Sequence, residues 1–469
     1  MHETRLQPPS SIKEICRTLE AAGHEAWCVG GAVRDALLGI ATLDWDIATS
    51  ALPEQVQKLF RRTVPVGIKF GTVGVLDRAG VLHEVTTFRH DVETDGRHAV
   101  VRFGASLDED LARRDFTINA IAVHAETLVV RDPFHGRRDL EAGIVRCVGE
   151  AAERMREDRL RALRAIRFAG RFGFAIEPAT WSAIRESAPH LGRLSMERVK
   201  QELEKVMEQV PRPSATLERY REAGIFGALV PALAAAPRER FRAIDHLGRP
   251  GLRGRPDRRA LRLAALFVQP GVVPGRDLER TLKALKYSNL EARATVALAQ
   301  AAGGLGTTVD PSLDGAPLRR VVATVGRLDL PALARLLWAH AAAAAEADGV
   351  GAADAAGTAA AERRARRVRG IALSRRAMRM AWHDPIALGD LAVDGDDLRA
   401  AGVGPGRVIG ETLARLLEAV LDDPAQNTRE RLLSLAVRGE CSGVCSHSTW
   451  TSRSRAVTWW NPRTACMRP

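Results

Sequence analysis

The pattern of apolar residues changes near residue 150, and this change constrains the fold more than any other feature of the chain. Before it, short apolar runs such as Ala26–Val29 and Val81–Phe88 are typical of buried strands. From Ala151 onward such runs nearly vanish, and helical patterns separated by Gly and Pro continue past Leu433. The sequence therefore predicts an α+β first domain with a mixed sheet, followed by an all-α remainder.

Element positions follow from the same periodicities. Strands are expected at 26–29, 43–49, 64–76, 81–88, 99–103 and 128–130. Helices are expected at 12–19, 53–62, 153–172, 178–187, 196–207 and 213–223. We expect a Gly/Pro/Arg loop at 248–256, and 339–368 is Ala-rich, which is compatible with a helix pair or a mobile linker. From Ser442 onward no apolar period exists, and we expect either a disordered tail or an aberrant one of the kind that a shifted reading frame gives.

The composition is globular and strongly basic. Lys and Arg number 69 against 57 Asp and Glu, which gives a net charge of +12. Either a polyanionic partner or a genome rich in Arg codons explains this excess. No apolar run reaches the roughly 18 residues of a membrane span, and the start lacks an apolar signal segment, so a cytoplasmic protein is expected. Cys16, Cys28 and Cys147 are expected to be buried, reduced thiols, while Cys441, Cys445 and Cys466 lack partners at zinc spacing.

Two carboxylates stand two residues apart on an expected strand. Side chains at such positions point to the same face, so Asp44 and Asp46 would repel one another unless a cation lay between them. Two divalent ions about 3.5–4 Å apart would meet that need and would catalyse in-line phosphoryl transfer. Mg²⁺ suits hard oxygen ligands and phosphates. The alternative is a solvated polar edge of the sheet.

A double glycine precedes an expected helix. Gly30 and Gly31 permit close backbone approach to a ligand, and Arg34 follows on that helix. The segment fits neither the dinucleotide-binding pattern nor the P-loop. A tight turn is the alternative interpretation.

Arg114 and Asp115 open a second polar motif, Arg113 to Ala120. One interpretation is a charged loop entering a buried helix. In the other, Arg114 holds a triphosphate through its two-pronged guanidinium. Asp115 would then add a third carboxylate or orient a ribose. Glu84 lies upstream, and 95–98 is a polar turn within a possible mobile loop.

A third motif occupies the expected helix 153–172. Asp158 and Arg161 are i, i+3 neighbours there, which suits a structural salt bridge. A carboxylate beside a guanidinium also complements the amino donor and ring-nitrogen acceptor of cytosine and adenine, whereas uracil and guanine present the reverse polarity. Arg164 continues this face. Arg167 lies about half a turn round from Asp158 and would serve phosphate or structure.

In this order and spacing, the three motifs resemble the class II tRNA nucleotidyltransferase / poly(A) polymerase family. Asp132-Pro133-Phe134 looks like the family's link from head to neck, and Ser195 to Leu203 looks like its helix-stabilising motif. Residues 404–433 resemble the tail of bacterial CCA-adding members. Arg159 is a departure, because many members carry proline or alanine there.

The resemblance implies a polymerase-β-type nucleotidyltransferase head followed by a helical neck, body and tail. Asp44 and Asp46 would hold Mg²⁺, with Asp115 at the ribose as the third catalytic residue. The residues that would bind substrate are Gly30, Gly31, Arg34, Arg114, Asp158, Arg161, Arg164 and Arg167. The division that the resemblance implies is a head at 1–148, a neck at 149–210, a body at 211–340 and a tail at 371–440. Composition adds an Ala-rich linker or helix at 341–370 and an end expected to be disordered at 441–469, which resembles nothing in the family.

The implied activity is addition of CCA to the 3′ end of tRNA from CTP and ATP, with release of pyrophosphate. The shared motifs leave two alternatives open. One is a poly(A) polymerase or an enzyme that adds only CC or only A. The other is a non-catalytic RNA-binding protein, which would be expected to lose its carboxylates, whereas this chain keeps Asp44, Asp46, Asp115 and Asp158.

Overall fold

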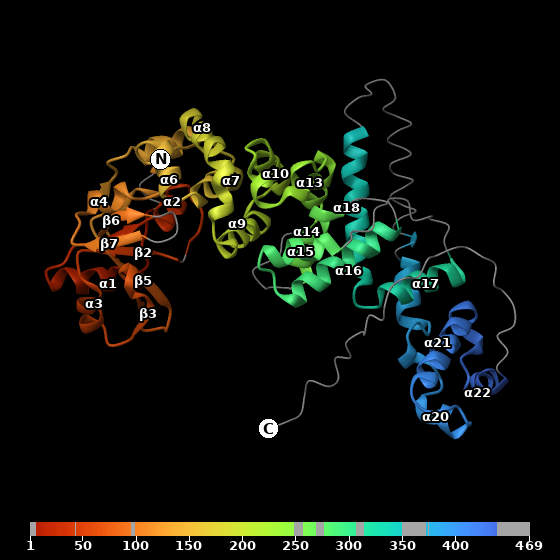
Figure 1. The fold of residues 1–469 in the computed structure, drawn as a ribbon. Helices are drawn as coiled ribbons and strands as arrows, with labels where there is room; N and C mark the ends of the chain where they lie inside the picture. Colours follow the sequence, from red (N-terminus) through yellow and green to blue (C-terminus); the bar gives the residue numbers. More distant parts are fainter. Residues whose placement is uncertain are drawn as a thin grey trace. The chain divides into compact units, whose positions relative to one another are not determined.

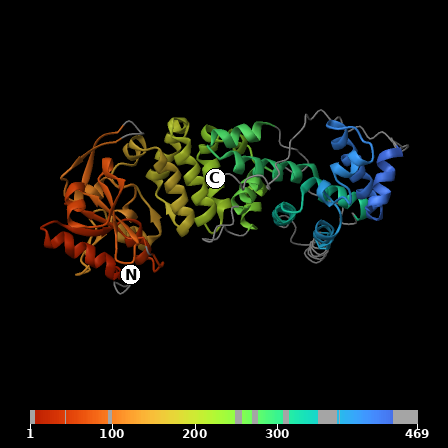
Figure 2. The same cartoon turned by 90° about the horizontal axis from the view of Figure 1, so that it is seen from below.

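The structure is a computed structural model that describes residues 6–42, 44–94, 99–247, 257–268, 276–305, 314–348, 372–373 and 375–438 (Figures 1 and 2). It divides into two compact units, Met1–Asp314 with Thr324–Trp382 and Gly315–Ala323 with His383–Pro469. The expected loops at 95–98 and 248–256, most of the Ala-rich segment and the end of the chain from 439 lie outside the described residues.

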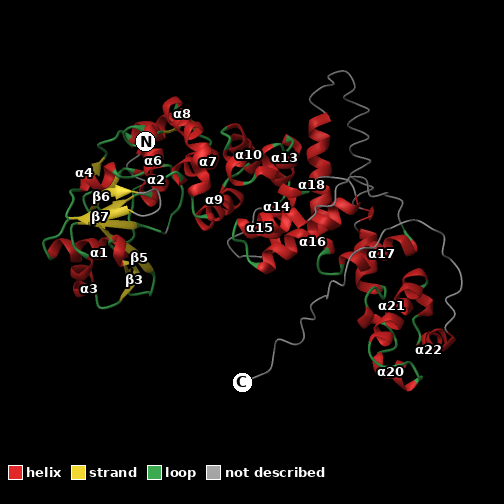
Figure 3. Cartoon of the chain, viewed as in Figure 1, coloured by secondary structure: helices red, strands yellow, loops and turns green. Residues whose placement is uncertain are grey.

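The N-terminal part of the first unit contains the sheets (Figure 3). Its mixed seven-stranded sheet has the order β3-β4-β5-β2-β1-β8-β9, in which β2 and β5 are parallel and all other neighbours antiparallel. These strands are β1 (Ala26–Val29), β2 (Asp46–Thr49), β3 (Thr63–Gly67), β4 (Thr72–Leu76), β5 (Leu82–Thr87), β8 (Ala122–Val123) and β9 (Val130–Arg131). A separate hairpin pairs β6 (Arg89–Thr94) with β7 (Ala99–Phe103).

Short helices accompany this sheet. They are α1 (Ser10–Ala21), α2 (Gly31–Leu37), α3 (Pro53–Leu59), α4 (Leu107–Ala112) and α5 (Gly136–Ala142), with 3-10 turns η2 (Ile68–Phe70) and η3 (Thr117–Asn119). The predicted period of α1 is confirmed, since Ile12, Ile15, Cys16 and Leu19 are all buried. Cys28 and Cys147 are also buried free thiols, as expected.

The strand expected at 64–76 is wrong as a single element. The chain turns at η2 and at Gly71, whose φ of +83° favours glycine, and β4 then pairs back antiparallel with β3. The hairpin strand β6 was not predicted, and β2 begins only at Asp46.

Helices make up the rest of the first unit. They are α6 (Ala151–Glu157), α7 (Leu160–Phe172), α8 (Pro178–Ser187), α9 (Met196–Gln209), α10 (Pro213–Glu222), α11 (Ile225–Leu229), α12 (Pro231–Ala234), α13 (Arg238–Asp245), α14 (Asp257–Phe267), α15 (Arg276–Ala284), α16 (Asn289–Leu305) and α18 (Leu330–Asp348), with the 3-10 helix η4 (Ala188–Arg193). A two-stranded parallel sheet, β10 (Ile144–Val145) with β11 (Ala175–Ile176), lies where the head meets α7. The predicted α+β class with a helical remainder is confirmed.

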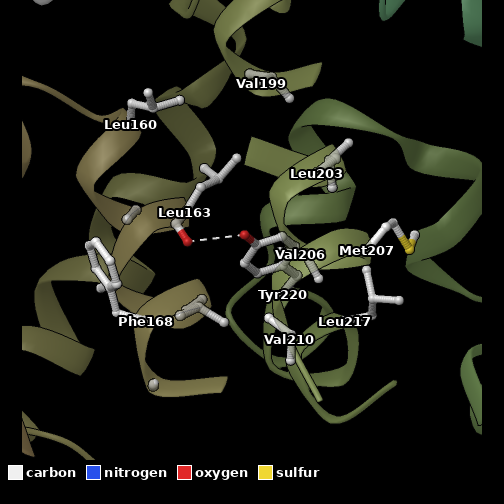
Figure 4. Packing of buried hydrophobic residues seen from close by; sticks show 14 of the residues in the cluster. Leu160, Leu163, Phe168, Val199, Leu203, Val206, Met207, Val210, Leu217 and Tyr220 are labelled. Atoms are coloured by element: carbon white, nitrogen blue, oxygen red, sulfur yellow. Dashed lines mark hydrogen bonds between the residues drawn. The ribbon is translucent and has the colours of Figure 1, made fainter. Parts of the chain in front are cut away.

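Helix α7 packs against α9 and α10 through an apolar interface (Figure 4). Leu163, Leu203 and Leu217 are buried in it. The hydroxyl of Tyr220 donates a 3.0 Å hydrogen bond to the carbonyl oxygen of Leu163, which satisfies the polar end of a fully buried ring. This interface fixes α7, the helix that carries the third sequence motif.

The second unit is helical and has its own core. Its helices are α20 (Gly395–Ala400), α21 (Arg407–Asp422) and α22 (Arg429–Arg438), together with the first part of α17 (Gly315–Val325). Val393, Leu398, Leu416, Val420 and Leu432 form the buried cluster. Among the helices that the structure describes, none combines the length and apolar character needed to cross a bilayer.

Candidate active site

Asp46 is the first residue of β2, in the middle of the mixed sheet, and Asp44 lies two residues before it. Trp45 between them is 3% exposed and packs into the core, while Asp44 is exposed and Asp46 is half-buried. The two carboxylates thus flank a buried ring, although Asp44 lies outside the strand on which both were expected. Burial raises the pKa of Asp46 to about 6, and the charges of Asp44 and then Glu84 add to the rise. Two neighbouring carboxylates therefore repel one another in a partly desolvated place.

Glu84 is a carboxylate that sequence reasoning did not assign to the site. Strand β5 runs parallel to β2, and the pairing of Ile47 with Val85 places Glu84 beside Asp46. The alternation along β5 leaves Glu84 exposed between the buried His83 and Val85. That alternation is visible in the sequence, but only the pairing of the two strands connects it to Asp46.

The double glycine faces the same place. Gly30 has a φ of +74° and precedes α2. A Cβ on Gly30 would lie 2.8 Å from Nη1 of Arg114 and 3.7 Å from Oδ2 of Asp46. Glycine is thus required for its backbone conformation and for the close approach of the guanidinium. Gly30, Arg114 and Asp46 consequently surround one small space.

Arg114 is held by its own loop. Its Nη2 lies 3.3 Å from Oδ2 of the buried Asp110, and its Nη1 donates to the carbonyl oxygen of Asn119 at 3.4 Å. These long contacts leave the guanidinium, 17% exposed, able to meet an anion across from Gly30.

Asp115 forms an ion pair with Arg164 and does not add to the repulsion at Asp46. Arg164 donates to Oδ2 from Nε at 2.8 Å and from Nη2 at 2.7 Å, and the Asn119 amide donates to Oδ1 at 2.8 Å. Burial alone would raise the pKa of Asp115. The Arg164 charge and the hydrogen bonds of Asn119 and Arg164 outweigh it, and the pKa falls to about 2. Asp115 is therefore ionised and fixed at the contact between head and α7.

Arg34 is buried at that same contact. Its guanidinium binds Asp35 through Nη2 at 2.6 Å and the Asn119 side chain through Nη1 at 2.5 Å. It also lies over the rings of Phe168 and Phe172, about 5 Å from each centroid. The structure thus places this residue between α2 and α7.

The third motif does not form the continuous helix that we predicted. Helix α6 ends at Glu157 and α7 begins at Leu160, and Asp158 between them has extended backbone angles. Asp158 Oδ1 accepts from the Leu160 N–H at 3.1 Å, which starts α7. A local hydrogen bond from a side chain thus interrupts a helix that apolar periodicity alone predicts to be continuous.

The side chains of Asp158 and Arg161 bind other residues in this structure. Asp158 Oδ2 accepts from Arg198 Nη2 at 2.6 Å. Arg161 donates to Glu157 at 2.7 Å and to the carbonyl oxygen of Arg113 at 3.1 Å. Sequence reasoning missed Arg198, because it comes from α9, some 40 residues away.

Arg167 forms a buried ion pair. Its Nε lies 2.6 Å from Glu202, and both side chains are at most 3% exposed. Of the two roles predicted for Arg167, this geometry matches the structural one. It joins α7 to α9.

The carboxylates suit a hard divalent cation. Asp44, Asp46 and Glu84 crowd negative charge at one place, which a cation would relieve. No three Asp, Glu, His or Cys side chains form a metal cage within the described ranges. An ion held there would therefore complete its shell with water and phosphate oxygens, as small divalent ions commonly do.

Comparison with known proteins agrees with this geometry. Residues 26–146 match the family described as "Poly A polymerase head domain", and residues 173–236 match "Probable RNA and SrmB- binding site of polymerase A". The CCA-adding enzyme of Geobacillus kaustophilus is 43% identical over 287 residues, which cover 61% of this chain and 68% of that enzyme. The chain belongs to the class II CCA-adding enzyme and poly(A) polymerase head family.

Other members of the family give the same result. The CCA-adding enzyme of Lactiplantibacillus plantarum is 50% identical over 199 residues, which span about half (48%) of its length. The crystal structure of the Bacillus stearothermophilus CCA-adding enzyme in complex with CTP superposes with a TM-score of 0.70 at 33% identity, covering 92% of this chain and 98% of that one. The predicted family and fold are therefore confirmed.

Proposed function

We propose that this chain adds C, C and A in turn to the 3′ end of tRNA, using CTP and ATP and releasing pyrophosphate. The observation that carries the proposal is the common position of Asp46, Gly30 and Arg114 beside the exposed Asp44. Membership of the CCA-adding enzyme family supports the reaction. The match of residues 173–236 to an RNA-binding region supports an RNA primer.

The chemistry is an in-line displacement at the α-phosphate of the nucleotide. The 3′-hydroxyl oxygen of the primer forms the new bond to phosphorus, and pyrophosphate leaves with the electrons of the broken bond. Mg²⁺, held by Asp44 and Asp46, would supply charge neutralisation for the reacting phosphates. Positioning supplies most of the remaining rate, because phosphoryl transfer needs no covalent protein intermediate.

Arg114 is proposed to bind the triphosphate across from the Gly30–Gly31 backbone. Its guanidinium has two donors on one edge, and its existing contacts at 3.3 and 3.4 Å are long enough to exchange for phosphate oxygens. Asp115 and Arg164 would lie at the ribose side as a fixed ion pair. Arg34 and Arg167 would hold the head and α9 against α7.

Asp158 and Arg161 are proposed to select the base. A carboxylate accepts from the amino group of cytosine or adenine, and a guanidinium donates to the neighbouring ring nitrogen. Uracil would leave both protein groups without partners, which is costly in a desolvated site. Asp158 retains acceptor capacity, because a carboxylate offers about four lone pairs and its side-chain donors among the described residues are the Leu160 amide and Arg198.

The metal assignment is tested with the double variant Asp44→Ala, Asp46→Ala. Incorporation of CTP and ATP should vanish, whereas retention of tRNA on a filter should survive. Persistent incorporation would contradict the assignment.

A product assay separates the activities of the family. On a tRNA lacking its last three nucleotides, CTP and ATP should give exactly three additions. A long ladder would indicate a poly(A) polymerase, and two or one additions would indicate a CC-adding or A-adding enzyme. Absence of magnesium-dependent pyrophosphate release from CTP would favour the non-catalytic alternative.

A further inference from the structure

Three arginines, from α6, from the link between α6 and α7 and from the end of η4, lie around the junction of α6 and α7. Arg156 is exposed in the last turn of α6, and Arg159 stands between the two helices. Arg193 is exposed at the end of η4. We call Arg156, Arg159 and Arg193 the junction arginines.

Geometry and electrostatics place the junction arginines together. Nη1 of Arg159 lies 3.4 Å from the hydroxyl of Ser187, the residue directly before η4. The pKa of Arg159 is lowered by burial and then by the charges of Arg193 and Arg156. The structure thus concentrates like charges at this point.

Carboxylates near the junction are bound to other arginines. Glu157 pairs with Arg154 at 2.9 Å and with Arg161 at 2.7 Å, and Asp158 pairs with Arg198 at 2.6 Å. Within the part of the chain that the structure describes, no ion pair joins Arg156 or Arg159 to a carboxylate. An external anion would offset the charge of Arg156 and Arg159.

The anion is best explained as an RNA backbone. Ser187 and Arg193 fall inside residues 173–236, the segment that matches an RNA-binding region. A nucleotide triphosphate already has Arg114 and the Gly30 backbone in the head. Three arginines distributed over three elements suit successive phosphates of a strand better than one compact triphosphate.

We propose that the junction arginines bind backbone phosphates of the tRNA next to Asp158, so that the 3′ end is held beside the base-selecting residues. This inference rests on the proposed function. It also gives a role to Arg159, the position at which this chain departs from the family pattern.

The test measures binding of tRNA lacking CCA, without nucleotide, at several salt concentrations. In the triple variant Arg156→Ala, Arg159→Ala, Arg193→Ala, the steepness of log affinity plotted against log salt concentration should decrease by about 2. Each lost phosphate contact removes roughly 0.7–0.9 from that slope. Affinity near 0.15 M salt should fall roughly 10- to 100-fold. The KM for CTP at saturating tRNA should change by less than about twofold, since the substitutions leave the groups that bind the nucleotide in place.

Two matched variants control for charge and for folding. Arg17→Ala, Arg78→Ala, Arg131→Ala removes three exposed arginines that each pair with a carboxylate in the head, and it should change the slope much less. The triple Lys variant of the junction arginines keeps the charge and should retain most of the slope. Thermal unfolding of each variant shows whether it folds. If the triple Ala variant misfolds, the salt dependence of tRNA binding is measured on the single Arg159→Ala variant instead.

The results have distinct meanings. An unchanged slope and affinity in the triple Ala variant would overturn the inference. A raised KM for CTP with unchanged tRNA affinity would assign the arginines to the nucleotide and would also overturn it. If the unaltered chain itself failed to retain tRNA, the proposed function would fall, and this inference with it.

Discussion

At the scale of single residues, Asp46 illustrates how a site for a cation is built at the expense of stability. Its pKa is raised to about 6 by burial and by Asp44 and Glu84, so the folded chain binds more protons than the unfolded chain between about pH 4 and 6. The free energy of unfolding therefore decreases as the pH rises through this range, because Asp46 loses its proton in the folded chain. Without metal at pH 7.5, Asp46→Asn should increase the free energy of unfolding by roughly 1–3 kcal/mol.

The measurement is urea unfolding in EDTA at pH 7.5 and again at pH 4. The gain of Asp46→Asn should shrink toward pH 4, while incorporation is lost at every pH. Asp115→Asn is the matched control with the opposite sign. The depressed pKa of Asp115 stabilises the fold above pH 4, so breaking its pair with Arg164 should cost about 2–4 kcal/mol at neutral pH. Destabilisation by Asp46→Asn would refute the argument.

Also at this scale, the contact of Arg198 with Asp158 predicts a selectivity effect. Asp158→Ala should reduce discrimination against UTP, because the acceptor for the amino group is lost. Arg198→Ala should also reduce discrimination against UTP, but less, since the Asp158 carboxylate remains and loses only the contact that orients it. The ratio of kcat/KM for CTP and UTP checks both variants. Lys205→Ala, which removes another α9 cation paired with Glu202, serves as the control and should leave that ratio unchanged.

At the scale of elements, helix α7 depends on close contact with α10. A Cβ on Gly170 would lie 1.9 Å from Oγ1 of Thr216, so the two helices can approach only because position 170 is glycine. Gly170→Ala should destabilise the chain by about 1–3 kcal/mol, the usual cost of overpacking.

Thermal unfolding of the single and double variants tests this contact. Gly170→Ala combined with Thr216→Ala should recover part of the loss, because the clashing oxygen is gone. Gly227→Ala is the matched control: it is also in a helix, but no atom lies within 4 Å of its Cβ, so its effect should be near zero or stabilising. Equal losses at positions 170 and 227 would contradict the packing explanation.

At the scale of the whole molecule, the two compact units have separate cores. Leu398 is fully buried in the second unit, and Leu217 is fully buried in the first. Leu398→Ala should therefore lower only the stability of the second unit, by about 2–5 kcal/mol. Calorimetry should show one transition shifted and the other unchanged, with Leu217→Ala giving the reverse. A shift of both transitions by either variant would indicate that the units unfold as one.

Local periodicity in the sequence was enough to predict the class of fold, because the change from strand to helix patterns near residue 150 is visible within short stretches of chain. The same kind of local pattern predicted a common face for Asp44 and Asp46, and Trp45 between them is buried. The ordered motifs indicated the family for the same reason, since each lies within a short stretch of chain. Local sequence misled where a turn or a cap competed with periodicity, at Gly71 and at Asp158, and it also missed strand β6.

Which distant residues meet depends on how the elements pack in three dimensions. Glu84 joins Asp46 through the parallel pairing of β5 with β2, and Arg198 reaches Asp158 from α9. Arg34, close to Gly31, is buried over the Phe168 and Phe172 rings of α7. These contacts arise from packing between segments tens of residues apart, and no periodicity within either segment encodes which partner it will find.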